Sequence, residues 1–158
     1  EAEVRHAGEI PVLTVYLPMR EITVGIPVEA AIGEIVDGIE LPDALRELRP
    51  MRALLRMAAN LVGWANDIYT FEKELREGEP CNLVAVLARA RGLSLQEAVT
   101  RAAAMHDGEA RRFVALLEEV SYLGDAAARY ADMLRCWVRG HLDWAHETGR
   151  YPAPPATT

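Results

Sequence analysis

The sequence predicts an all-α protein, a bundle of helices that forms a single domain. Apolar residues recur at i, i+3 and i+4 along nearly the whole chain, and the stretches rich in Val and Ile that would favour strands are short. The 158 residues are 51% hydrophobic and 26% charged, which fits a globular domain with a real core and excludes a disordered segment. No internal repeat with a period of roughly 20–50 residues is visible, so a compact bundle is favoured over a helical solenoid.

Two short helices are predicted at the start of the chain. Pro11 can occupy the first turn of one helix, because the missing backbone N–H is tolerated there. Gly25 and Pro27 end this helix, since proline disfavours the helical conformation of the residue before it. A second helix covers residues 28–36 and ends at Gly38.

A long helix is predicted in the centre of the chain. Pro42 opens a short segment, Pro50 punctuates it, and from there the helical spacing of apolar residues continues to Gly78. The apolar residues that carry this spacing are Leu54, Leu55, Ala58, Leu61, Val62, Ala65, Tyr69 and Leu75. An unbroken pattern of this length predicts one helix.

Three further helices complete the predicted bundle. One covers residues 82–90 and ends at Gly92, and the next begins at a capping box formed by Ser94 and Glu97. A loop is expected near Gly124, before the last helix.

The end of the chain differs in composition from the rest. The last helix is predicted to end at Gly149, and a proline-rich tail covers residues 152–158. The helical domain is therefore expected to span residues 1–151. The first residue is Glu1 and no secretion signal follows it, so we expect the chain to be a later segment of a longer protein.

Charge and cysteine content exclude several classes of protein. The formal net charge of −7 does not favour binding to nucleic acid or to an anionic membrane, so any bound anion must meet local cations. Cys81 and Cys136 are too few for a disulfide framework, which fits a cytoplasmic location. The longest apolar stretch without a charge, residues 57–65, is far shorter than the roughly 20 residues of a membrane span.

Polar residues on the long helix form a candidate metal site. At 100° per residue, Asn66, Thr70 and Glu74 are each displaced by about 40° and rise by about 6 Å per step, so their oxygens share one face. Lys73 returns to within about 20° of Asn66. Oxygen ligands of low charge suit Mg²⁺, which takes its remaining ligands from water and substrate phosphates, and the lysine suits the same phosphates.

A different interpretation of these residues stays open at this point. Asn66 and Asp67 are common helix-cap residues and could start a new helix, with Thr70, Lys73 and Glu74 facing water. Against this, they follow an apolar run without any break signal, and polar residues of poor helix propensity on a packed helix need partners. The spacing alone does not decide between the two interpretations.

Three segments together resemble bacterial class I terpene synthases. Residues 66–74, which read NDIYTFEKE, are similar to the second metal-binding motif of that family, the asparagine–serine/threonine–glutamate triad. Residues 140–151 resemble the carboxy-terminal signature that ends in an Arg-Tyr pair, and residues 16–25 resemble the segment that carries the diphosphate-sensing arginine. The three motifs occur in the family's order and cover almost the whole chain.

The resemblance implies a role for particular residues. Asn66, Thr70 and Glu74 would hold one Mg²⁺ of the three that the complete site contains. The residues that would bind the substrate diphosphate are Arg20, Lys73, Arg150 and Tyr151. The residues at the family's linker and effector positions would be Thr23 and Val24. Considered singly, Arg20 could be a surface arginine and Arg150 a cation that stabilises a helix C-terminus.

The resemblance also implies the fold and the reaction. The fold would be the helical bundle of class I terpene synthases, and the reaction the Mg²⁺-dependent ionisation and cyclisation of a linear prenyl diphosphate with release of diphosphate. Farnesyl diphosphate is the expected substrate because most bacterial relatives use it. The carbocation needs a dry, apolar cavity with aromatic walls, and Trp137 is the residue that we expect to line it.

One motif of the family is missing. Asp37 and Asp43 stand singly and no two aspartates are adjacent, so the aspartate-rich first metal motif is absent. We therefore expect the chain to be the carboxy-terminal half of the domain, inactive alone, with an upstream aspartate-rich half as its partner. The oligomeric state stays open, a homodimer included. The alternative is a catalytically inactive helical fragment or interaction module that retains the fold.

Overall fold

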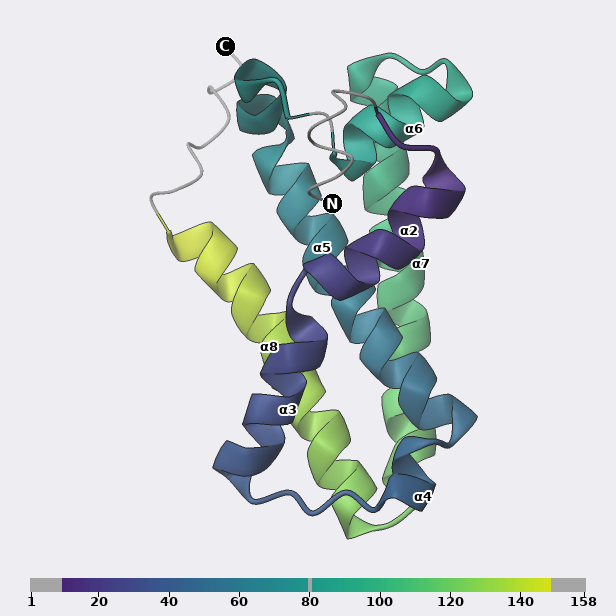
Figure 1. Ribbon diagram of the computed structural model, residues 1–158, viewed down its shortest axis with the longest axis vertical. Helices are drawn as coiled ribbons and strands as arrows, with labels where there is room; N and C mark the ends of the chain where they lie inside the picture. The colour runs from purple at the N-terminus through teal and green to yellow at the C-terminus, as the bar shows by residue number, and fades with distance from the viewer. Residues whose placement is uncertain (1–9, 80, 149–158) are drawn as a thin grey trace.

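The protein is a helical bundle in the computed structural model, which describes residues 10–79 and 81–148 (Figure 1). Within these residues no strand occurs, so the prediction of an all-α fold is confirmed. The described helices are α2 (Leu13–Thr23), α3 (Ile26–Asp37), α4 (Asp43–Arg46), α5 (Arg49–Glu77), α6 (Leu83–Arg91), α7 (Leu95–Ser121) and α8 (Asp125–Glu147). The long helices α5, α7 and α8 pack against one another, α2 lies across α5, and α3 packs on α5 and α8 (Figure 1).

Helix α5 runs without a break through the candidate metal site. It begins at Arg49, with Pro50 in its first turn, and ends before Gly78, whose φ of 72° is left-handed. Asn66 and Asp67 therefore lie in the middle of a helix, and the interpretation of these two residues as helix caps is wrong. The apolar residues on both sides of them keep the helix packed through this region.

The break between α2 and α3 differs in detail from the expectation. Helix α2 ends at Thr23, and Gly25, with a φ of 91°, is the N-cap of α3. Helix α3 begins at Ile26, two residues earlier than predicted, because Pro27 occupies its first turn, where a missing N–H costs nothing. Proline in this sequence thus starts the second helix as well as limiting the first.

The N-terminus of α7 carries the predicted capping box. The Ser94 hydroxyl accepts a hydrogen bond from the Glu97 amide at 3.3 Å, and the Glu97 carboxylate accepts one from the Ser94 amide at 2.8 Å. Together the two bonds satisfy donors that would otherwise have no partner within the helix.

Replacing Ser94 with alanine is expected to destabilise the protein by about 1 kcal/mol at neutral pH, because the cap is lost. The hydrogen bonds from Ser94 lower the pKa of Glu97, so this carboxylate stabilises the native state above the unfolded pKa. That contribution is lost as the pH falls below about 4.5 and through the lowered value. Urea unfolding of both proteins at pH 7 and pH 3 measures this; an equal difference at the two pH values would contradict the role of Glu97.

The core consists of two clusters of buried side chains. One lies between α3, α5, α7 and α8 and includes Leu54, Leu61, Phe113 and Leu134, all at most 3% exposed. The other lies between α2, α5, α6 and α7 and is built on Tyr16, Trp64, Leu83, Val84, Val86, Leu87, Ala98 and Ala102. Helix α5 contributes to both clusters and so forms the centre of the bundle.

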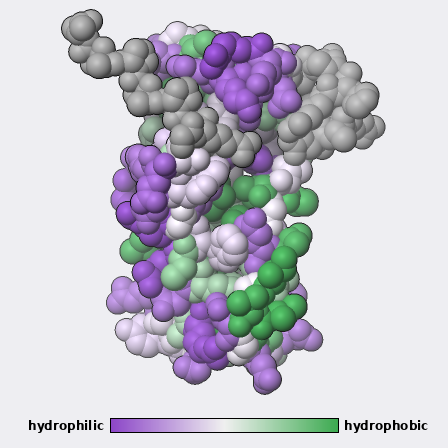
Figure 2. Space-filling view, turned by 90° about the vertical axis from the view of Figure 1, so that its left-hand side faces the viewer, coloured by the Kyte–Doolittle hydropathy of each residue, from purple (hydrophilic) through white to green (hydrophobic). Residues whose placement is uncertain are grey.

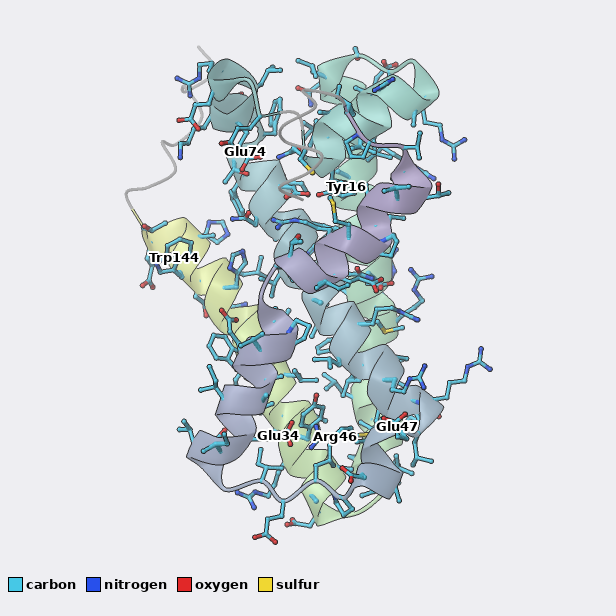
Figure 3. The ribbon with its side chains drawn as sticks, viewed as in Figure 1. Tyr16, Glu34, Arg46, Glu47, Glu74 and Trp144 are labelled. Atoms are coloured by element: carbon cyan, nitrogen blue, oxygen red, sulfur yellow. The ribbon has the colours of Figure 1, made fainter. Side chains whose placement is uncertain are left out.

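Two contacts fix the position of α3. The guanidinium of Arg46 binds both carboxylate oxygens of Glu34 at 2.8 and 2.6 Å and ties α4 to α3 (Figure 3). Gly33 lets α3 approach α8, because a Cβ at this position would overlap Sδ of Met133 and lie 3.5 Å from the indole nitrogen of Trp137. The close approach brings the indole nitrogen of Trp137 next to Gly33 of α3.

The outer face of α3 is apolar. Val28, Ile32, Ile35 and Val36 are 54–82% exposed, and Figure 2 shows a strongly hydrophobic patch at its lower right, where α3 lies. Within the described residues, no helix has both the length and the apolar surface needed to cross a membrane.

Candidate functional site

An open cavity of about 900 Å³ lies between α2, α3, α5 and α8. Its polar lining residues on the first three of these helices are Arg20, Thr23, Glu29, Asp37 and Asn66. Its apolar and aromatic lining residues are Val24, Ile26, Ile39, Val62, Met133, Trp137 and Trp144. The cavity thus presents the Arg20 cation, the Asn66 amide and the carboxylates of Glu29, Asp37 and Asp132, together with aliphatic and aromatic surface.

Arg20 is held rigidly at the cavity by α5. Its Nε donates to Oδ1 of Asp67 at 3.1 Å, and its Nη2 lies 2.9 Å from the same oxygen. Nη2 also donates to Oδ1 of Asn66 at 2.9 Å. With only 13% of its side chain exposed, Arg20 is a largely buried cation next to the candidate metal site and not the surface arginine of the alternative interpretation.

The buried carboxylate of Asp67 connects Arg20 to the other helices around this part of the site. It is 2% exposed and accepts hydrogen bonds from the Tyr16 hydroxyl and, at 3.0 Å, from the backbone amide of Leu83, besides those from Arg20. The carboxylate therefore joins α2, α5 and the start of α6. The unbroken apolar run before Asp67 indicated from the sequence that this residue needs partners, but it did not indicate which residues these are.

Gly63 makes room for Arg20. A Cβ at this position would lie 3.3 Å from Cγ of Arg20 and 3.6 Å from a methyl group of Val24. The first of these distances is tighter than normal packing, so alanine at this position would require the Arg20 side chain to shift by a few tenths of an ångström. The glycine is thus part of the arrangement that orients Arg20.

The three candidate metal ligands lie along α5, as the helical spacing predicts. The Thr70 hydroxyl donates to the backbone oxygen of Asn66 at 2.9 Å, which leaves its lone pairs for another partner. One carboxylate oxygen of Glu74, Oε2, accepts a hydrogen bond from Asn82 at 2.9 Å. Of the three residues, Asn66 lines the cavity.

This set of donors fits Mg²⁺. Amide, hydroxyl and carboxylate oxygens are hard ligands, and Mg²⁺ commonly keeps water and substrate oxygens in its remaining positions. No group of three or more His, Cys, Asp or Glu side chains that could hold a metal occurs in the part of the chain that the structure describes. A cation bound by these three residues would therefore take its remaining ligands from water or from a bound molecule.

Of the other predicted site residues, some line the cavity and some do not. Thr23, Val24 and Trp137 line the cavity. Lys73 is half exposed, and its ammonium lies 3.8 Å from Glu77, so the structure does not bring it to Arg20. Arg150 and Tyr151 lie outside the described residues.

Two lining residues on α8 were missed by the sequence analysis. Trp144, whose ring contacts His141, is half exposed and lies below Glu74 in Figure 3. Burial, the charge of Arg20 and the neighbouring His106 lower the pKa of His141, so its imidazole is neutral at pH 7. Both residues could have been found by extending the helical spacing from Trp137, since positions 4 and 7 residues further along lie near the same face.

Comparison with known proteins identifies the family. Residues 1–112 match the family described as terpene synthase family 2, C-terminal metal binding. Bonnadiene synthase of Allokutzneria albata is 37% identical over 158 residues, with 97% of this chain and 44% of that protein covered. A Streptomyces viridochromogenes enzyme, 7-epi-alpha-eudesmol synthase ((2E,6E)-farnesyl diphosphate cyclizing), is 32% identical, with 89% of this chain and 44% of that protein covered.

A solved structure matches over the same length. The crystal structure of 2-methylisoborneol synthase from Streptomyces coelicolor A3(2), in complex with Mg²⁺ and geranyl-S-thiolodiphosphate, superimposes with a TM-score of 0.89 at 28% identity. The match covers 98% of this chain and 50% of that one. The chain thus spans about half the length of its relatives, and the predicted resemblance and fold are confirmed. The motifs and these comparisons together show that the chain belongs to the terpene synthase family and corresponds to its C-terminal, metal-binding half.

Proposed function

We propose that this chain is the C-terminal half of the catalytic domain of a Mg²⁺-dependent terpene cyclase. The reaction is ionisation and cyclisation of a linear prenyl diphosphate, with farnesyl diphosphate as substrate. An upstream half carries the aspartate-rich motif and the ligands for the other two of three ions. The named activity of the eudesmol synthase relative supports this substrate.

One observation carries the proposal: a largely buried arginine is held by hydrogen bonds at a cavity that also has apolar and aromatic walls. Asp67 and Asn66 orient the Arg20 guanidinium, and Asn66 is also a candidate Mg²⁺ ligand. Negative charge develops on the diphosphate as the carbon–oxygen bond breaks, so a cation in a fixed orientation stabilises the transition state more than the substrate.

The remaining residues take complementary roles. Asn66, Thr70 and Glu74 would hold one Mg²⁺, which when bound would supply positive charge that stabilises the departing diphosphate. Arg150 and Tyr151 bind the diphosphate together with Arg20, whereas Lys73, which lies beside Glu77 and does not line the cavity, is not included in this set. Thr23 and Val24 line the cavity at the α2–α3 break, where backbone carbonyls without helical partners can face the carbocation. Trp137 and Trp144 also line the cavity, and aromatic rings stabilise a nearby cation.

Replacing Glu74 with glutamine in the enzyme that contains this chain is expected to reduce turnover at least tenfold at limiting Mg²⁺. The change keeps the side chain's size and removes the charge that binds the metal. Raising the Mg²⁺ concentration should restore part of the activity. Product formation from farnesyl diphosphate, measured by gas chromatography across a Mg²⁺ titration, gives the result.

The matched control is Glu77→Gln, one turn further along α5 on a half-exposed residue that pairs with Lys73. It should leave the Mg²⁺ dependence unchanged. If both variants behave alike, Glu74 is a solvated helix residue, and the inactive helical fragment or interaction module becomes the better account.

A further inference from the structure

Asn82, at the start of α6, makes three hydrogen bonds with its side chain. Its Nδ2 donates to Oε2 of Glu74 and to the backbone oxygen of Asp67, each at 2.9 Å. Its Oδ1 accepts from the backbone amide of Val84 at 2.9 Å and so caps the helix. The residue is 2% exposed, and rotating its amide group by 180° would break all three bonds.

The bond to Glu74 restricts a side chain that would otherwise move freely. Glu74 stands one turn before the end of α5 and is partly exposed, and a free glutamate loses considerable rotamer entropy when it is fixed on a metal. A donor on Oε2 fixes the carboxylate before the metal arrives and leaves Oε1 to bind it. Ligands that are held in this way typically bind metal more tightly than unsupported ones.

The same turn of chain also supports the arginine. Asn82 donates to the backbone oxygen of Asp67, and the adjacent Leu83 amide donates to the Asp67 carboxylate that holds Arg20. The start of α6 therefore contacts both Glu74 and the residue that orients Arg20. A single rigid segment thus sets the metal ligand and the arginine relative to each other.

We infer that Asn82 is a positioning residue of the metal site: through its hydrogen bond it holds the Glu74 carboxylate ready to bind a divalent cation. The inference rests on the proposed function, because it takes Glu74 as a metal ligand. It adds a residue that lies outside the three motifs of the sequence analysis and touches neither metal nor substrate.

Two substitutions separate positioning from helix capping. Asn82→Ser keeps a residue that caps helices well but cannot reach Glu74, whereas Asn82→Ala removes the cap and the bond together. The probe is Mn²⁺ in the presence of inorganic diphosphate, added to the 158-residue chain, with free Mn²⁺ followed by electron paramagnetic resonance. Thermal melts of the metal-free proteins report the structural effect separately.

We expect both variants to weaken Mn²⁺ binding by about tenfold, while the melting temperature falls clearly more for Asn82→Ala than for Asn82→Ser. The double variant Glu74→Gln/Asn82→Ser should bind no more weakly than Glu74→Gln alone. In the metal-free chain labelled with ¹⁵N, Glu74→Gln should shift the side-chain amide resonances of Asn82, because the carboxylate that accepts from them is replaced.

The outcomes that overturn the inference are distinct. If Asn82→Ser binds Mn²⁺ within twofold of the unchanged chain while Glu74→Gln binds it weakly, the inference about Asn82 is overturned and the proposed metal site is not. If the Mn²⁺ affinities of the two variants fall in proportion to their melting temperatures, Asn82 acts only as a helix cap and the inference is overturned as well. An unchanged chain that binds no Mn²⁺ overturns the proposed metal site, and the inference with it.

Discussion

Replacing Asp67 with alanine is expected to lower the free energy of unfolding by roughly 3–5 kcal/mol. The carboxylate is 2% exposed and accepts from Tyr16, Arg20 and Leu83. Its removal leaves the Arg20 guanidinium as an uncompensated charge in a place where water reaches only 13% of the side chain. Urea unfolding followed by circular dichroism measures the loss.

The control for this change is Asp143→Ala, which removes an equally close but exposed ion pair. Asp143 and Arg139 on α8 are joined at 2.9 and 2.5 Å, with side chains 45% and 72% exposed. Water replaces such a pair at little cost, so the unfolding midpoint should hardly move. A loss for Asp67→Ala as small as that of the control would mean that the Arg20–Asp67 pair is solvated in solution.

Replacing Arg20 with lysine is expected to weaken binding of inorganic diphosphate in the presence of Mg²⁺ by about tenfold or more. Lysine keeps the charge but is a single point of contact, so it cannot donate to Asp67 and Asn66 while also facing a diphosphate. Losing one charge-assisted hydrogen bond of about 1.5–3 kcal/mol corresponds to this factor. Calorimetric titration of the chain measures the affinity.

Arg129→Lys is the matched control for this experiment. Arg129 also lines the cavity, but its guanidinium donates to the backbone oxygens of Asp37 and Gly38 at 2.5 and 3.3 Å. Its replacement should leave diphosphate affinity unchanged. Equal losses for the two variants would show that the overall charge of the cavity, and not the oriented guanidinium of Arg20, binds the diphosphate.

Features that depend on neighbouring residues could be predicted from the sequence. The capping box of Ser94 and Glu97 involves residues three apart, and the shared face of Asn66, Thr70 and Glu74 follows from helix geometry alone. The start of α3 was misplaced because proline is compatible with both the end of one helix and the first turn of the next.

Features that depend on distant partners could not be predicted. Asp67 meets Tyr16 across 51 residues and Arg20 across 47, and no local pattern encodes such a meeting. The role of Asn82 as a donor to Glu74 depends on how the chain turns between α5 and α6, and a single Asn before an apolar run indicates only a helix cap. The space that Gly63 leaves for Arg20 is equally invisible, because it depends on the crossing of α2 and α5.

Gly63 has a consequence for attempts to make this protein more heat-resistant. Glycine in the interior of a helix is less favourable than alanine by about 1 kcal/mol, so a search for stabilising substitutions would select this position early. Here the added methyl group would gain helix propensity but crowd Cγ of Arg20, which would lie 3.3 Å from it. A screen by melting temperature alone would not register the resulting shift of Arg20, so variants at this residue of α5 also need a measurement of diphosphate binding.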